Sequence, residues 1–399
     1  MASHGVTLDP VAPDVRVAVE HEAREAGRVA TRLPPPPRRN WGALAGQAAA
    51  ALIVVLFLGW LAHNVDDALA RRNINVDFGF LLRPAGFDIP FRLAPWQAGE
   101  PYGKALLVAG LNTALASALA IALATLLGLV LALLRLSSNP LGSGMSRGAV
   151  ELIRNTPQLL QIVFWYIAVL QVLPGPRASI ALGSLAFLNV RGLFVPAPLS
   201  PLFGWIILGG IGLGLLLPRV LRRAPLLLTV AVPLLAGFGL AFATTSYDYP
   251  ALRGFNFTGG WRLPPELLAL VVGVGIYTSA FIAENVRASI EAVSHGQREA
   301  ARSLGLPPGR TMRLVILPQA LRTLLPPLTN HYLNIIKSTT LGAAIAYPEI
   351  LQIFARTALN QSGRAVEVMT LVLGVFLMIN LLVSAAMNRW DRKLQAQGR

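Results

Sequence analysis

The chain has 399 residues, of which 54% are hydrophobic and only 13% charged, and its mean hydropathy is +0.57. The few polar residues cannot cover the surface of a soluble fold of this size. The composition therefore predicts an integral membrane protein. The net charge of +15 is attributed to membrane topology rather than to nucleic-acid binding, and the absence of cysteine excludes disulfides and thiolate metal sites.

The apolar runs along the chain predict an all-α fold. Residues 1–42 mix arginine with acidic residues and end in a stretch rich in proline and arginine, which favours a cytoplasmic tail. Runs of about twenty apolar residues can cross a bilayer. Eight runs of this kind are found, at 43–62, 105–134, 152–173, 203–217, 225–244, 266–286, 338–357 and 366–388. We therefore expect about eight transmembrane helices.

The distribution of basic residues predicts the orientation of these spans. Eight spans place both termini on one side, and with the N-terminus inside, the inner segments hold 21 Lys or Arg residues against 11 in the outer segments. Because basic residues favour the cytoplasmic side, both termini, including the tail 391–399, are expected in the cytoplasm. The loops 63–104 and 174–202 are then periplasmic, and the segment 291–337 is cytoplasmic.

The segment 291–337 carries the most informative local pattern. Ala300, Ala301 and Leu304 recur at helical spacing and predict a small apolar face on a short helix that also carries Glu299. Gly305 and the following prolines end this helix and allow a second one to start at an angle, towards Leu317 and Pro318. We expect a compact projection that docks against another protein. The alternative is an ordinary basic inner loop.

This pattern resembles the cytoplasmic coupling loop of ABC importer permeases of the polar amino-acid uptake family. The family pattern is Glu-Ala-Ala, three residues, Gly, nine residues and Ile-x-Leu-Pro, and the chain departs from it only at Val315, where Ile is usual. The resemblance covers 105–173 and 266–390 and is greatest to general L-amino-acid permeases with an inserted pair of spans. It implies a type I importer core, to which the span 43–62 and the insertion 174–265 are added.

The same resemblance implies a function. The chain would be the permease subunit of an ATP-driven importer of polar L-amino acids in the bacterial inner membrane. A cytoplasmic ATP-binding subunit would dock on the coupling loop, a periplasmic amino-acid-binding protein would deliver substrate, and a second homologous permease would complete a heterodimer. The coupling residues would be Glu299, Ala300, Ala301, Leu304, Gly305, Leu317 and Pro318.

The sequence itself gives no reason to expect an enzyme. A phosphate-binding loop of the form Gly-x-x-x-x-Gly-Lys-[Ser/Thr] does not occur in it, so ATP hydrolysis is expected from a separate subunit. We expect no cofactor and no metal. The alternative function is an ion-coupled secondary amino-acid transporter, which would also contain broken helices and intramembrane charges but would not need the coupling loop.

Ionisable residues within spans are candidates for the substrate pathway because burying them in lipid is costly. Glu151 and Arg154 are three residues apart at the inner end of the third span, and Glu284 and Arg287 have the same spacing at the inner end of the sixth. Each pair either neutralises itself along its helix or lines a cytoplasmic mouth, where the ammonium and carboxylate groups of a substrate need partners.

Hydroxyl groups near two predicted breaks are further candidates. Thr156 precedes Pro157, which interrupts the third span. Lys337, Thr339 and Thr340 resemble the Lys-x-Thr-Ser motif of the family, with Thr340 in place of Ser. These hydroxyls either bind substrate or donate to the carbonyl four residues back in their own helix.

Small residues in the second span predict a helix-packing face. They follow one another at helical spacing from Ala116 through Ala120 and Ala124 to Gly128. A ridge of small side chains lets helix backbones approach closely, so this face is expected to pack against another helix.

Overall fold

The computed structural model describes residues 41–71, 76–183, 185–200, 202–220 and 226–396. Most of the predicted tail 1–42, and the end of the tail 391–399, lie outside the described residues. The chain divides into two compact units, 1–75 and 76–399. In the first, helix α2 (Trp41–Arg71) contains the predicted span 43–62 and is longer by about three turns. Its stretch Ala45–Val65 has a mean hydropathy of 2.0 and is not buried by other parts of the chain.

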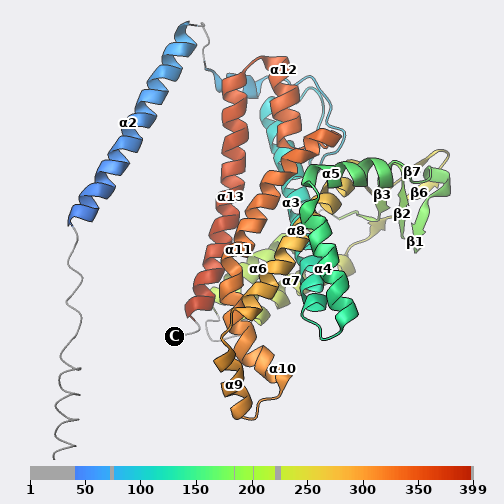
Figure 1. The fold of residues 1–399 in the computed structure, drawn as a ribbon. Helices are drawn as coiled ribbons and strands as arrows, with labels where there is room; N and C mark the ends of the chain where they lie inside the picture. The colour runs from blue at the N-terminus through green and yellow to red at the C-terminus, as the bar shows by residue number, and fades with distance from the viewer. Residues whose placement is uncertain (1–40, 72–75, 184, 201, 221–225, 397–399) are drawn as a thin grey trace, which may run out of the picture. The chain divides into compact units, whose positions relative to one another are not determined.

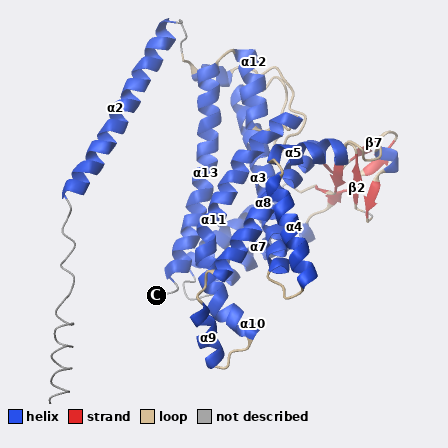
Figure 2. Cartoon of the chain, in the orientation of Figure 1, coloured by secondary structure: helices blue, strands red, loops and turns tan. Residues whose placement is uncertain are grey.

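The second unit is mostly helical (Figures 1 and 2). Among the described residues, three of its helices are long and apolar enough to cross a membrane, in addition to α2. They are α3 (Tyr102–Arg135), α8 (Pro265–Glu291) and α13 (Ala365–Ala396). The predicted spans 105–134, 266–286 and 366–388 lie within these helices, which run further at both ends because polar caps and charged residues can continue a helix beyond its apolar part.

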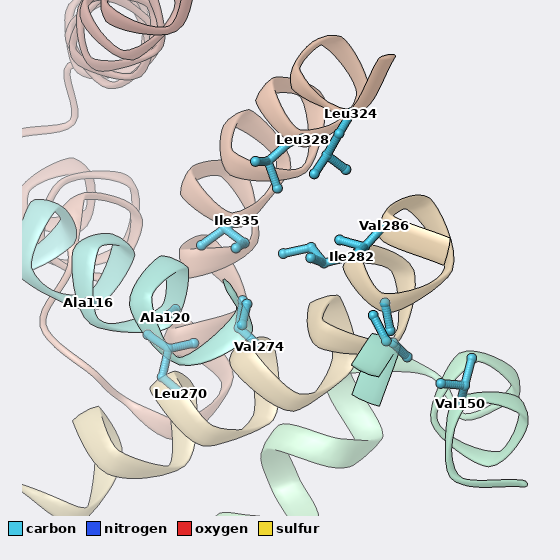
Figure 3. Close-up of a cluster of buried hydrophobic side chains, with 14 of the residues drawn as sticks. Ala116, Ala120, Val150, Leu270, Val274, Ile282, Val286, Leu324, Leu328 and Ile335 are labelled. Carbon is cyan, nitrogen blue, oxygen red and sulfur yellow. The ribbon is translucent and has the colours of Figure 1, made fainter. Parts of the chain in front are cut away.

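Helix α8 is the centre of the bundle, and α3 lies along it. The small residues Ala116, Ala120, Ala124 and Gly128 are all buried, as the ridge predicted. A Cβ atom added to Gly128 would lie 2.7 Å from Ile282 Cγ2 on α8, so the two backbones are in close contact. Figure 3 shows the surrounding apolar cluster, in which side chains of α3 and α8 meet those of α11 (Leu317–Ser338).

The predicted third span, 152–173, is wrong in its boundaries. The structure has α4 (Pro140–Asn155), a break at Thr156 and Pro157, and then α5 (Gln158–Phe164), which continues as the π-helical turn η2 (Trp165–Leu170). Asn139 caps α4 by accepting from the Leu141 backbone N–H at 2.9 Å. Proline lacks an N–H and disfavours helical conformation in the residue before it, so Pro157 separates two helices within one apolar run.

The predicted seventh span, 338–357, is also wrong, and the helical part of the segment 291–337 extends well beyond the two short helices that were predicted there. The second half of that segment is the long helix α11, whose buried apolar face is masked in the sequence by polar residues and by the internal prolines Pro326 and Pro327. The run 338–357 instead forms η5 (Thr339–Ile345) and η6 (Leu351–Ala358), followed by α12 (Leu359–Ser362). Ala346 between them has a left-handed backbone with φ of 59°.

Within its described residues, the insertion 174–265 contains two apolar helices and eight short strands, so the prediction of an all-α fold is wrong in this part. The helices α6 (Leu202–Val220) and α7 (Leu226–Thr244) pack on each other, with Gly210 against Gly237. The strands are β1 (Ile180–Leu182), β2 (Ala186–Asn189), β3 (Gly192–Val195), β4 (Ala197–Pro198), β5 (Tyr247–Asp248), β6 (Ala251–Arg253), β7 (Asn256–Thr258) and β8 (Trp261–Leu263). All pairs are antiparallel, in the order β1-β2-β3-β8, β4-β5 and β6-β7.

The close approach of α3 and α8 can be tested with one methyl group. Gly128→Ala should lower stability by about 1–3 kcal/mol, since the new Cβ forces the helices apart or distorts them. Gly110→Ala is the matched control on the same helix, because a Cβ there meets no atom within 4 Å. Thermal unfolding of the purified protein measures both, and equal midpoints for the two variants would contradict the packing.

Candidate functional site

The predicted coupling loop forms a compact projection at the lower end of the second unit in Figure 1. It consists of α9 (His295–Ser303), α10 (Pro308–Thr311) and the π-helical turn η4 (Met312–Ile316), which leads into α11. Gly305 closes α9 with φ of 74°, a conformation that glycine adopts without strain. Its N–H donates to the Arg302 carbonyl at 2.9 Å, and the Leu306 N–H donates to the Ala301 carbonyl at 3.1 Å. These two bonds are the Schellman motif expected at a helix end.

The predicted apolar face of α9 is divided by the structure. Ala301 is only 3% exposed and packs inward, whereas Leu304 is 81% exposed. Ala300 and Glu299 are exposed as well, and the Glu299 carboxylate lies 3.0 Å from His295 Nδ1. Residues close in sequence therefore lie on opposite sides of this short helix. Ala301 packs inward and anchors the helix, whereas Leu304 is available for contact with a partner. The outer side presents a large, unpartnered apolar side chain at its tip.

Hydrogen bonds hold this projection to the bundle. Arg298 Nη2 donates to the Ile290 carbonyl at the end of α8, at 2.9 Å. Gln319 Nε2, on α11, donates to the Val315 carbonyl at 3.0 Å and lies 3.4 Å from Gln297 Oε1 of α9. The projection is therefore connected to both α8 and α11 and can pass movement to them.

The last two coupling residues lie where η4 becomes α11. Pro318 stands near the start of α11, where the π-helical turn η4 passes into the α-helix. Leu317 beside it is exposed, and the preceding Ile316 is buried. This junction therefore has an inner and an outer side, as α9 has.

The structure gives the two predicted acid–base pairs different environments. Glu284 binds Arg287 on its own helix and Arg135 at the end of α3, both at 2.5 Å, and Arg287 also binds Glu291. Among the described residues Glu151 and Arg154 form no ion pair, and the Arg154 guanidinium lies 5.1 Å from the centre of the Phe281 ring. Equal spacing along two helices did not give equal environments, because only Glu284 faces a third charged side chain from another helix.

The predicted hydroxyl groups donate within their own helices. Thr156 Oγ1 donates to the Leu152 carbonyl at 2.8 Å, and Thr339 and Thr340 donate to carbonyls three residues back at 2.7 Å each. Lys337 is exposed. Between them, Ser338 donates to Gln158 Oε1 at 3.1 Å and so connects the end of α11 to α5.

A buried polar cluster that the sequence analysis missed lies between η5 and η6. Asn112 Nδ2, on α3, donates to the carbonyls of Phe91 and Pro348 at 2.8 and 2.9 Å. The Tyr347 hydroxyl donates to the Asn112 carbonyl at 2.9 Å. Pro348 and Glu349 interrupt an apolar run in the sequence. The sequence does not show that Asn112, 236 residues before Pro348, donates to the Pro348 carbonyl.

Glu349 is the acidic member of this cluster and is 0% exposed. Its two carboxylate oxygens accept from the backbone N–H groups of Leu351 and Gln352 at 2.8 and 2.7 Å. The side chain therefore caps the start of η6, where helical N–H groups have no partner of their own. Together with Asn112 it fixes the break in the chain against α3.

Comparison with known proteins identifies the architecture. The family model described as the inner membrane component of binding-protein-dependent transport systems matches residues 124–396. The chain belongs to this family. The resemblance found in the coupling loop is thus confirmed over most of the chain, and the permease is an integral inner-membrane protein of an amino-acid ABC transporter.

The permease covers nearly the full length of several curated relatives. It is 46% identical to the putative amino-acid ABC transporter permease YhdX of Escherichia coli K12, over 87% of the chain and 93% of YhdX. It is 38% identical to the general L-amino acid transport system permease AapQ of Rhizobium johnstonii, over 87% and 91%. It is 36% identical to the glutamate/glutamine/aspartate/asparagine permease BztB of Rhodobacter capsulatus, over 87% and 93%.

The difference between the two predicted acid–base pairs gives a matched test. Glu284→Gln leaves Arg135 and Arg287 without their shared carboxylate and should destabilise the permease by about 1–3 kcal/mol, with loss of transport. Glu151→Gln removes an exposed carboxylate that forms no ion pair among the described residues and should leave the stability unchanged. Thermal unfolding measures the stability of both variants, and uptake into proteoliposomes measures transport by Glu284→Gln. Equal unfolding midpoints for the two variants would contradict the assignment.

The cap at Glu349 can be separated from a charge requirement. Glu349→Gln keeps one carbonyl acceptor for the η6 backbone and should retain a substantial part of transport, whereas Glu349→Leu should lose the cap and destabilise the permease by about 0.5–2 kcal/mol or more. Equal loss of uptake in both variants, with normal folding of the Gln variant, would show that the charge itself is needed.

Proposed function

We propose that this chain is the transmembrane subunit of an ATP-driven importer of polar L-amino acids. A separate ATPase in the cytoplasm supplies the energy, and the permease converts ATP-dependent closure of that ATPase into alternating access of a site within the membrane. The observation that carries this proposal is the tip of the coupling projection, where Leu304 stands 81% exposed on a rigidly closed helix end. An apolar side chain presented in this way fits a pocket on a partner.

Mechanical transmission follows from the contacts of the projection. A movement of α9 pulls on α8 through Arg298 and on α11 through Gln319. Helix α8 is packed closely on α3 along most of its length, and its inner end carries the Glu284 ion pairs to α3. The three helices therefore move as a group, which is what rocking of one permease half against another requires.

The proposed partners follow from the family and its relatives. The family is defined by dependence on a binding protein, and an ABC permease works with an ATPase. A general L-amino acid system and one for glutamate, glutamine, aspartate and asparagine are among the relatives, which supports polar amino acids as substrates. One permease supplies half of a pathway, so we propose a heterodimer with a second, homologous permease. The distribution of basic residues supports a cytoplasmic position for both termini.

The proposed pathway residues lie near the C-terminal ends of α4, α8 and α11. Its candidate residues are Glu151, Arg154, Thr156, Glu284, Arg287, Lys337, Thr339 and Thr340. The exposed side chains of Glu151, Arg154 and Lys337 are the ones available to a zwitterionic substrate. The threonine hydroxyls already donate to backbone carbonyls, so we assign them to shaping the helix ends.

The coupling assignment predicts the effect of one charge at the tip. Leu304→Glu should abolish association with the ATPase while membrane insertion and folding remain normal, because a carboxylate cannot be buried in an apolar pocket. Leu304→Met keeps an apolar side chain and serves as the control. Co-purification of the ATPase with each variant measures the effect, and normal association of the Glu variant would refute the docking role.

Energy source distinguishes this proposal from an ion-coupled transporter. Purification from host membranes, with mass spectrometry of every accompanying chain, should recover an ATPase and a second permease. Uptake into proteoliposomes should then require ATP on the side of the membrane where the coupling loop lies. Collapse of ion gradients should not reduce this uptake. Gradient-dependent uptake by the isolated chain would favour the alternative function.

A further inference from the structure

The strands of the insertion carry an excess of positive charge. Residues 174–200 and 245–264 contain four arginines and one acidic residue. That residue, Asp248, accepts a hydrogen bond from the Gly260 N–H at 3.0 Å. The four arginines are Arg177, Arg191, Arg253 and Arg262, and we call them the arginine surface. All are exposed, and within the described part of the chain no ion pair involves any of them.

The register of the sheet places this surface away from the helices of the insertion. Val195 of β3 is paired with Trp261 of β8, and both line an open pocket of about 480 Å³ that is also lined by Phe203 of α6 and Phe242 of α7. Successive side chains of a strand point to opposite faces. Arg262 therefore lies on the other face of the sheet, opposite to the apolar helix pair α6 and α7.

Aromatic packing supports that outer face. Phe257 of β7 stacks on Phe187 and Phe194, with ring centres 4.8 and 4.9 Å apart. Phe194 is the cross-strand partner of Arg262. The hairpin of β6 and β7 is thereby fixed on the sheet, and it brings Arg253 into the same module.

Two of the guanidinium groups are held in place by contacts of their own. Arg262 Nε donates to the Arg191 carbonyl at 3.0 Å. The Arg177 guanidinium lies 4.1 Å from the centre of the Phe255 ring, and Phe255 is 70% exposed. The arginine surface thus combines oriented positive charges with an exposed aromatic ring, and arginine and aromatic residues are enriched where proteins bind each other.

We propose that the arginine surface docks an acidic face of the amino-acid-binding protein that serves this permease. The inference rests on the proposed function and on the predicted periplasmic side of these strands. These four exposed arginines form no ion pair among the described residues, so their positive charge is available to complement an acidic protein surface. A protein in aqueous space fits better than anionic lipid, because the surface faces away from the apolar helix pair that holds the module in the bilayer.

The test measures docking through ATP hydrolysis by the complete transporter in phosphatidylcholine nanodiscs. The probe is the binding protein whose deletion abolishes uptake in the host, loaded with substrate. In Arg253→Glu/Arg262→Glu, the binding-protein concentration for half-maximal stimulation should rise about tenfold at low salt, with less difference at high salt because surface charges are screened. The rate at saturating binding protein should be unchanged.

Two control variants define what the measurement reports. Arg147→Glu reverses the charge of an exposed arginine on α4, at the predicted inner side, and should leave the half-maximal concentration unchanged. Arg253→Lys/Arg262→Lys keeps the charge and should recover most of the affinity. If the double Glu variant does not fold, Arg177→Glu carries the same expectation, since it lies outside the strands.

Three results would overturn the proposal. An unchanged half-maximal concentration in the folded Glu variants would refute the docking role alone. Normal stimulation of the Glu variants together with loss of their binding to phosphatidylglycerol vesicles would also refute it and would assign the surface to lipid. Failure of any binding protein to stimulate the wild-type transporter would refute the proposed function itself.

Discussion

The close contact between α3 and α8 is the constraint on which the rest of the permease depends. Both helices are long and apolar enough to cross a membrane. Lipid is as apolar as their side chains and provides no hydrophobic drive for them to associate. Their association must come from van der Waals contact between backbones, which the small residues around Gly128 permit. A methyl group is therefore as disruptive here as a large side chain elsewhere.

This contact also organises the polar groups. Because α3 is fixed against α8, Asn112 is held where it can bind the break between η5 and η6, and Arg135 at the other end is held beside Glu284. Irregular backbone within a membrane requires partners from protein, since lipid offers none. Two residues of α3 thus have different roles. Asn112 stabilises the break between η5 and η6. Arg135 holds the end of α8 that lies next to the coupling projection.

The insertion follows a different logic from the core. Its helices α6 and α7 add apolar surface, and its strands form a module whose two faces differ in character, one lining an apolar pocket and the other bearing the arginine surface. Two added helices that both crossed the membrane would leave the orientation of later segments unchanged, which is compatible with the predicted position of the coupling loop.

The sequence alone determined the class of protein, the helices α3, α8 and α13, the small-residue ridge and the coupling loop, because hydropathy and helical spacing are local properties. It failed at α11 and at 338–357, where polar residues and prolines hide a helix and an apolar run hides a break. Only the tertiary structure decided that Glu284 is shared by two arginines, while Glu151 forms no ion pair within the part of the chain that the structure describes. It also decided that Ala301 is buried and Leu304 exposed. These outcomes depend on which side chains arrive from distant segments, and spacing along one helix does not contain that information.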